Sequence, residues 1–203
     1  MTDCGCGFEQ TNKLERKALI MLLSINGVMF IAEIILGWIA QSTGLIADSL
    51  DMLADAAVYG LSLYVVGKGV LFQAKSARLS GLLQIILGLG VVFEVFRRLV
   101  FGSEPQSLII VVVGLVALAA NIMCLIIISK HREGGVHMRA SWIFSKNDVI
   151  ANIGVIVSGG LVTLMDSRYP DLIVGTIISA IVIRGGIKIL QDAKQVSDAG
   201  SSA

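Results

Sequence analysis

Three aspartates interrupt an otherwise apolar stretch in the first third of the chain. Asp48, Asp51 and Asp55 lie within residues 45–55, whose other side chains are mostly apolar. On a helix, Asp51 and Asp55 are four residues apart and share a face, and Asp48 lies one turn earlier on nearly the same side. A carboxylate in lipid is energetically costly, so several on one helix call for a functional explanation. Such a face could replace the water that a divalent cation sheds inside a membrane.

A fourth carboxylate, Asp148, occurs in a later apolar segment. At about 1.5 Å rise per residue, Asp51 and Asp55 lie roughly 10 and 16 Å in from Gly44, and Asp148 lies roughly 15 Å in from Met138 on the opposite side. In a hydrocarbon core about 30 Å thick, all three approach the midplane. Oxygen ligands suit divalent cations, and three carboxylates overcompensate a doubly positive ion. Protons would then compete with the metal for one site, whereas hydrogen bonds made for packing are the alternative explanation.

Composition indicates a polytopic membrane protein around these residues. The chain has 203 residues, of which 55% are hydrophobic and 15% are charged, less charge than a soluble domain usually carries. The apolar residues fall in long runs, so we predict an all-α fold with six transmembrane helices. Their expected positions are about 18–40, 45–67, 79–100, 106–129, 140–165 and 171–190.

The expected domain organisation has three parts. A cytoplasmic N-terminal segment at 1–17, polar and mobile, precedes a six-helix transporter domain at 18–190, and a short cytoplasmic tail occupies 191–203. Gly44 is expected to separate the first two spans and to form a tight hairpin turn between them. The first apolar run is too long for a typical signal peptide, so we interpret it as a retained span.

Lys and Arg give the orientation. Thirteen of them fall on one predicted side, and only Arg97, Arg98 and Arg168 fall on the other. The positive-inside rule therefore places both termini in the cytoplasm, and an even number of spans agrees. The net charge of +1 gives no reason to expect a nucleic-acid partner. The expected location is the cell membrane, which would be the inner membrane in a bacterium.

Two stretches resemble a known family. Residues 37–55, GWIAQSTGLIADSLDMLAD, look like spans one and two of the cation diffusion facilitator family, and residues 147–156, NDVIANIGVI, look like part of its span five. That family exports Zn²⁺ and related divalent ions, usually against protons. Its site takes two ligands four residues apart from each of spans two and five. The resemblance implies that Asp51 and Asp55 are the first pair and that Asp148 is one member of the second.

The chain departs from the family pattern in two places. The other span-five ligand falls on Phe144, which cannot coordinate a metal, so the fourth ligand would be water, Asn152 or Asn147. Family members commonly carry a cytoplasmic C-terminal domain that binds metal and dimerises, and only a short tail follows Lys194 here. We therefore expect a short form without that domain. We expect it to form a homodimer whose interface consists of the membrane helices. Glycines in spans three and six either form such a dimer face or pack within one subunit.

Four further residues are candidates for metal or proton handling. Asp48 either receives the leaving ion near the outer mouth or caps the start of span two. Glu33, deep in span one, either relays protons or makes a packing hydrogen bond. Cys4 and Cys6 are thiols that would suit a soft metal ion, although two ligands fall short of the usual four and a plain terminal segment is the alternative.

These observations predict a transporter with no enzymatic activity and no resident cofactor. We predict a proton-coupled divalent cation exporter for Zn²⁺, with Cd²⁺ and Co²⁺ as further candidates. The main alternative is a non-transporting relative that binds metal or a partner. An intramembrane aspartyl protease would need a Gly-Xaa-Gly-Asp sequence, which does not occur. A small-molecule/proton antiporter would need a roomy aromatic cavity, yet only 6% of residues are aromatic.

Overall fold

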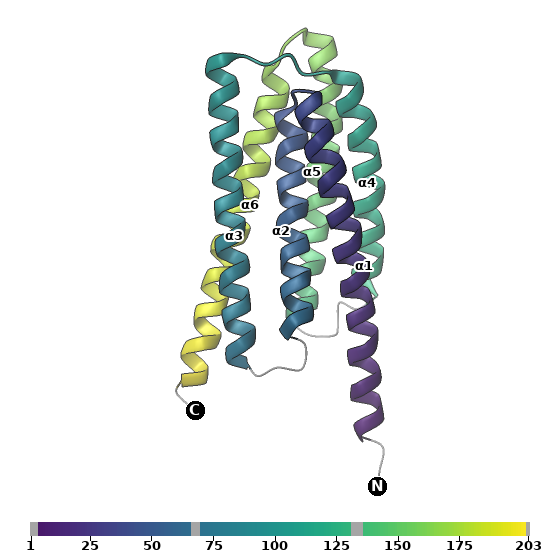
Figure 1. The fold of residues 1–203 in the computed structure, drawn as a ribbon, viewed down its shortest axis with the longest axis vertical. Coiled ribbons are helices and arrows are strands. Elements are labelled where there is room, and N and C mark those ends of the chain that lie inside the picture. Colours follow the sequence, from purple (N-terminus) through teal and green to yellow (C-terminus); the bar gives the residue numbers. More distant parts are fainter. Residues whose placement is uncertain (1–3, 66–69, 131–135, 202–203) are drawn as a thin grey trace.

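In the computed structural model the chain forms six long helices (Figure 1). The structure describes residues 4–65, 70–130 and 136–201, without the side chains of residues 4–15, 65, 70, 71, 73, 74, 136–144, 147 and 196–201. The helices are α1 (Cys4–Ile39), α2 (Thr43–Val65), α3 (Val70–Phe101), α4 (Ser107–Ser129), α5 (Val136–Met165) and α6 (Tyr169–Ser201). No strand occurs in these ranges, so the predicted all-α fold is confirmed.

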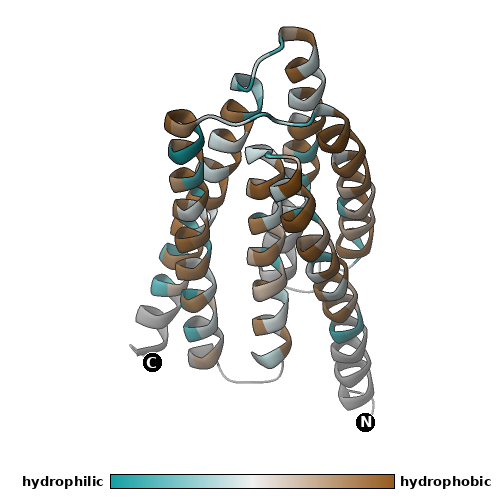
Figure 2. Ribbon diagram, turned by 45° about the horizontal axis from the view of Figure 1, so that its top comes forward, coloured by the Kyte–Doolittle hydropathy of each residue, from teal (hydrophilic) through white to brown (hydrophobic). Residues whose placement is uncertain are grey.

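Five of the helices are long and apolar enough to cross a membrane. The segments are Arg16–Ile39, Lys75–Phe101, Ser107–Ser129, Asp148–Met165 and Tyr169–Gln195. The helix α2 falls outside this group because of its three aspartates. Large apolar side chains such as Phe93, Leu108 and Leu164 are exposed, and Figure 2 shows apolar residues along the outer faces of the helices. Apolar surface on this scale needs a lipid environment, so the chain is a multi-pass membrane protein.

The helix ends differ from the sequence expectation. The helix α1 already begins at Cys4, so most of the segment expected to be mobile is helical, and α6 continues to Ser201 through most of the expected tail. The turn between α1 and α2 occupies residues 40–42 and not Gly44, with Gln41 at a φ of 49°. Hydropathy locates only the part of a helix that faces lipid. The polar residues that continue α1 and α6 beyond it leave no hydropathy signal.

The central helix of the bundle is α2, which packs against every other helix in the described part of the chain. The most extensive pairings are those of α3 with α6, α1 with α2, and α4 with α5. Both termini lie at one end of the bundle, and the α1–α2 turn lies at the other (Figure 1). We call these the terminal end and the turn end. Polar side chains on α2 are therefore surrounded by protein, which is what a carboxylate inside a membrane requires.

Glycines allow α3 and α6 to approach closely. A Cβ atom at Gly81 would lie 2.7 Å from the carbonyl oxygen of Gly186, and one at Gly88 would lie 2.5 Å from Cγ1 of Ile183. A Cβ at Gly90, by contrast, would meet nothing within 4 Å. Most of these glycines thus serve packing within one subunit, and the expected homodimer stays a prediction.

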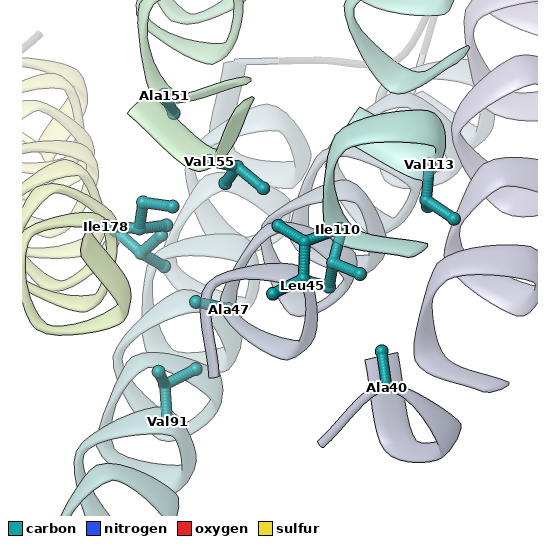
Figure 3. Close-up of a cluster of buried hydrophobic side chains, with 10 residues drawn as sticks. Ala40, Leu45, Ala47, Val91, Ile110, Val113, Ala151, Val155 and Ile178 are labelled. Atoms are coloured by element: carbon teal, nitrogen blue, oxygen red, sulfur yellow. The ribbon is translucent and has the colours of Figure 1, made fainter. Parts of the chain in front are cut away.

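Two apolar clusters lie at different heights along α2. The turn-end cluster is drawn in Figure 3 and surrounds the first turns of α2; it consists of Ala40, Leu45, Ala47, Val91, Ile110, Val113, Ala151, Val155, Ile178 and Val182. The terminal-end cluster consists of Leu19, Leu22, Tyr59, Cys124 and Ile128. Along α2, the three aspartates fall between the residues of these two clusters. Apolar packing on both sides therefore encloses the carboxylates.

Candidate metal-binding site

Carboxylates of α2 and α5 meet inside the bundle. The carboxyl group of Asp148 lies within hydrogen-bonding range of those of Asp51 and Asp55. Asp55 is buried, whereas Asp51 and Asp148 are half-buried. Because ionised carboxylates repel each other, two of them stay at this range only with a proton or a cation between them. The arrangement can thus hold either of the two kinds of ion that the sequence prediction invokes.

These three aspartates touch in pairs and do not form a closed cage. Within the described ranges, no group of three or more His, Cys, Asp or Glu side chains is arranged to hold a metal ion. Asp148 is the member that both α2 aspartates approach. A metal-ligand role for Asp51, Asp55 and Asp148 therefore stays a prediction, and ion binding would have to draw the three oxygen groups around one point.

Tyr59 orients Asp55 from the next turn of α2. Its hydroxyl donates a hydrogen bond to Oδ2 of Asp55 at 3.3 Å, and it also lies within hydrogen-bonding range of Ser145 on α5. Tyr59 and Ser145 are both buried. Tyr59 was not predicted from the sequence, although its position four residues after Asp55 was a usable signal, since residues at this spacing lie on the same face of a helix.

Asp48 belongs to a second polar group, nearer the turn end. Nδ2 of Asn152 donates to Oδ1 of Asp48 at 3.3 Å and to the backbone oxygen of Asp148 at 2.9 Å. The Glu33 carboxyl group lies within hydrogen-bonding range of that of Asp48. Glu33, Asp48 and Asn152 are all buried, with at most 1% exposed. This group links α1, α2 and α5 one turn away from Asp51.

The cap of α2 is Asp171 of α6, so the alternative that Asp48 caps this helix is wrong. Oδ1 of Asp171 accepts hydrogen bonds from Oγ of Ser42 at 2.6 Å and from the backbone N–H of Gly44 at 3.1 Å. Its Oδ2 accepts from the backbone N–H of Thr43. Oγ of Ser42 in turn accepts from the backbone N–H of Leu45 at 3.1 Å. A negative charge here satisfies the free N–H groups of the helix start and opposes its positive dipole end.

Three candidates from the sequence, and the position of Phe144, have side chains outside what the structure describes. Cys4 and Cys6 lie in the first turn of α1, and Phe144 and Asn147 lie on α5, but their side chains are not among the described ones. Their proposed roles stay predictions. Asn152 is described, and its Oδ1 has no hydrogen-bond partner among the described residues.

Comparisons with known proteins all point to one family. The cation efflux transmembrane domain matches residues 76–196, which is more than half of the chain. The zinc transporter ZitB of Yersinia pseudotuberculosis is 20% identical over 190 residues, covering 87% of this chain and 61% of its own length. The human proton-coupled zinc antiporter SLC30A8 is 26% identical over 220 residues, covering 95% of this chain and 60% of its own.

A third relative has a more general name. The metal cation efflux system protein CzcD of Cupriavidus metallidurans is 20% identical over 179 residues, covering 82% of this chain and 57% of its own length. The chain thus spans about six-tenths of the length of these curated relatives.

Proposed function

Since the chain belongs to the cation efflux family, we propose that it exports a divalent metal cation across the membrane in exchange for protons. Zn²⁺ is the first candidate ion, with Cd²⁺ and Co²⁺ next. The names of the similar proteins, which include zinc transporters and a proton-coupled zinc antiporter, support this choice. The protein would act in the cell membrane as a transporter and not as an enzyme.

One observation carries the proposed site, namely the contact of Asp148 on α5 with both Asp51 and Asp55 on α2. Three carboxylates that meet inside a membrane-spanning bundle offer the oxygen ligands that a divalent ion needs. Their combined charge exceeds that of the ion, so a departing ion leaves surplus negative charge in a poorly solvated place. Protons would replace it, and this competition would couple the two fluxes.

The packing of α2 suggests how access could alternate. The interface between α2 and α5 is much smaller than that between α2 and α1 or between α2 and α3. Separating α2 from α5 would therefore sacrifice less packing than separating α2 from its other partners. In this proposal the two carboxylate-bearing helices rock against each other around the ion, which opens the site to one side at a time.

Metal flux in proteoliposomes tests the proposal. We would impose a proton gradient and compare Zn²⁺, Cd²⁺, Co²⁺ and Mn²⁺ for the wild type, Asp51→Ala, Asp148→Ala and the control Asp192→Asn. Asp192 is exposed on α6, so its substitution should leave flux unchanged. Loss of a direct ligand should lower flux by at least about tenfold, because even outer-shell substitutions at metal sites cost about that much. Flux that survives both alanine variants would refute the site.

The second candidate is a non-transporting relative that binds metal or a partner. The observation that favours it is Phe144, which stands where the family resemblance places a ligand. This alternative expects metal binding without gradient-driven flux of any ion. Correctly inserted wild-type protein that carries none of the four ions would select it.

A further inference from the structure

Glu33 is a buried carboxyl group that faces another carboxyl group. Its exposed fraction is 0%, and among the described residues no hydroxyl, amide or other donor apart from a neighbouring carboxyl group bonds to its oxygens. The polar group beside it is the carboxyl of Asp48, which when ionised is also only an acceptor. A buried charge costs several kcal/mol unless it is paired or binds a cation. The two roles considered from the sequence, a proton relay and a packing hydrogen bond, therefore both depend on what lies between Glu33 and Asp48.

Three neighbouring side chains from three helices carry oxygens without a donor among the described residues. These oxygens are Oε1 and Oε2 of Glu33, Oδ2 of Asp48 and Oδ1 of Asn152. The hydrogen bond from Nδ2 of Asn152 to Oδ1 of Asp48, at 3.3 Å, ties the amide to this group. Carboxylate and amide oxygens are the ligands that hard divalent cations take. Apart from the amide N–H of Asn152, the group consists of acceptors, so it can hold a proton or a cation.

This group is displaced from the Asp51, Asp55 and Asp148 site toward the turn end. Along α2, Asp48 precedes Asp51 by roughly 4.5 Å and Asp55 by roughly 10 Å. Charge also leaves room for another cation. The two groups together contain five carboxylates, and a single divalent ion offsets two negative charges. The remainder has to be offset by protons or by a further cation.

We propose that Glu33, Asp48 and Asn152 form a second binding position for a divalent cation, separate from the Asp51, Asp55 and Asp148 site. If the chain exports cations as proposed above, this position receives the ion on its way toward the turn end. Its oxygen-only ligands suit ions such as Mn²⁺ better than thiophilic ones, and Co²⁺ is a convenient divalent probe. Glu33 is the ligand that distinguishes it from the first site, since it comes from α1.

Equilibrium dialysis with Co²⁺ tests this position in the full chain in lipid nanodiscs. Asp55→Asn combined with Asp148→Asn disables the first site with side chains of similar size. This double variant should still bind one Co²⁺ per chain. Adding Glu33→Gln should weaken that binding by at least about tenfold, as expected for loss of a direct ligand. Adding the control Asp192→Asn instead should change nothing.

Three outcomes would overturn the second position. The double variant could bind no Co²⁺ while circular dichroism and size-exclusion chromatography show that it is folded. The triple variant could bind as tightly as the double one. Should Glu33→Gln prevent folding, Asn152→Ala takes its place in the double variant, and unchanged Co²⁺ affinity would equally refute the proposal. Failure of proton-driven flux would refute the proposed function alone, because this binding assay does not depend on transport.

Discussion

Substitution of Asp171 should loosen the start of the central helix. This buried carboxylate of α6 accepts hydrogen bonds from Oγ of Ser42 and from the backbone N–H groups of Thr43 and Gly44. Asp171→Ala leaves all three donors without this acceptor. No other contact in the described chain joins a charged side chain of α6 to the start of α2. This side chain therefore adds a polar anchor at the start of α2 to the apolar packing that surrounds the helix.

The expected cost follows from the three lost hydrogen bonds. A buried donor left unsatisfied costs about 1–3 kcal/mol. Water that enters the vacated space recovers part of this, so we expect Asp171→Ala to lower the free energy of unfolding by about 3–5 kcal/mol, similar to breaking a buried charged pair. Asp171→Asn keeps one acceptor oxygen but loses the charge and one bond. It should cost about 2 kcal/mol, which matches a favourable carboxylate at a helix N-terminus.

Two measurements check this prediction. The first is unfolding by dodecyl sulfate in mixed micelles, followed by circular dichroism. The dodecyl sulfate fraction at the midpoint should be highest for the wild type, lower for Asp171→Asn and lowest for Asp171→Ala. The second is hydrogen–deuterium exchange, in which the backbone amides of residues 43–47 should exchange faster in Asp171→Ala than in the wild type. Asp166→Asn is the matched control, because Asp166 is exposed in the adjacent turn and its φ of 47° suits Asn. If Asp171→Ala matched this control in both measurements, the reasoning would be refuted.

Two further contrasts test the packing of α3. Gly81→Ala should lower the free energy of unfolding by about 1–3 kcal/mol, because its Cβ would lie 2.7 Å from a backbone oxygen of α6. Gly90→Ala, with open space around it, should be neutral or stabilising by up to about 1 kcal/mol, and equal midpoints for the two would contradict the packing. Glu94→Gln should cost about 3–5 kcal/mol, because it leaves the guanidinium of Arg98, which is 3% exposed, without its ion-pair partner at 2.6 Å. Glu94 also forms a salt bridge with the more exposed Arg97, and Arg97→Gln should shift the unfolding midpoint little. A shift as large as that of Glu94→Gln would contradict this difference between the two salt bridges.

Long apolar runs determined the fold class from the sequence alone. Six helices form where six spans were predicted, because a backbone inside lipid must satisfy its hydrogen bonds internally and a helix does so within a single segment. The extents of α1 and α6 were not predictable in the same way, since their polar ends lie beyond the part that hydropathy detects. The intramembrane aspartates were visible for the same reason as the spans, because a charge stands out in an apolar run.

Tertiary structure decided which carboxylate does what. Asp48 and Asp171 are both acidic residues near a helix start by sequence, yet Asp171 caps α2 while Asp48 lies against Glu33 and Asn152. The distance between Asp171 and Thr43 along the chain is 128 residues. Periodicity reports which side chains share a face of one helix, and spacing along the chain reports neighbours within a few turns. Neither reports which helices pack together, and only that packing brings Glu33, Asp48 and Asn152 from three helices into one group.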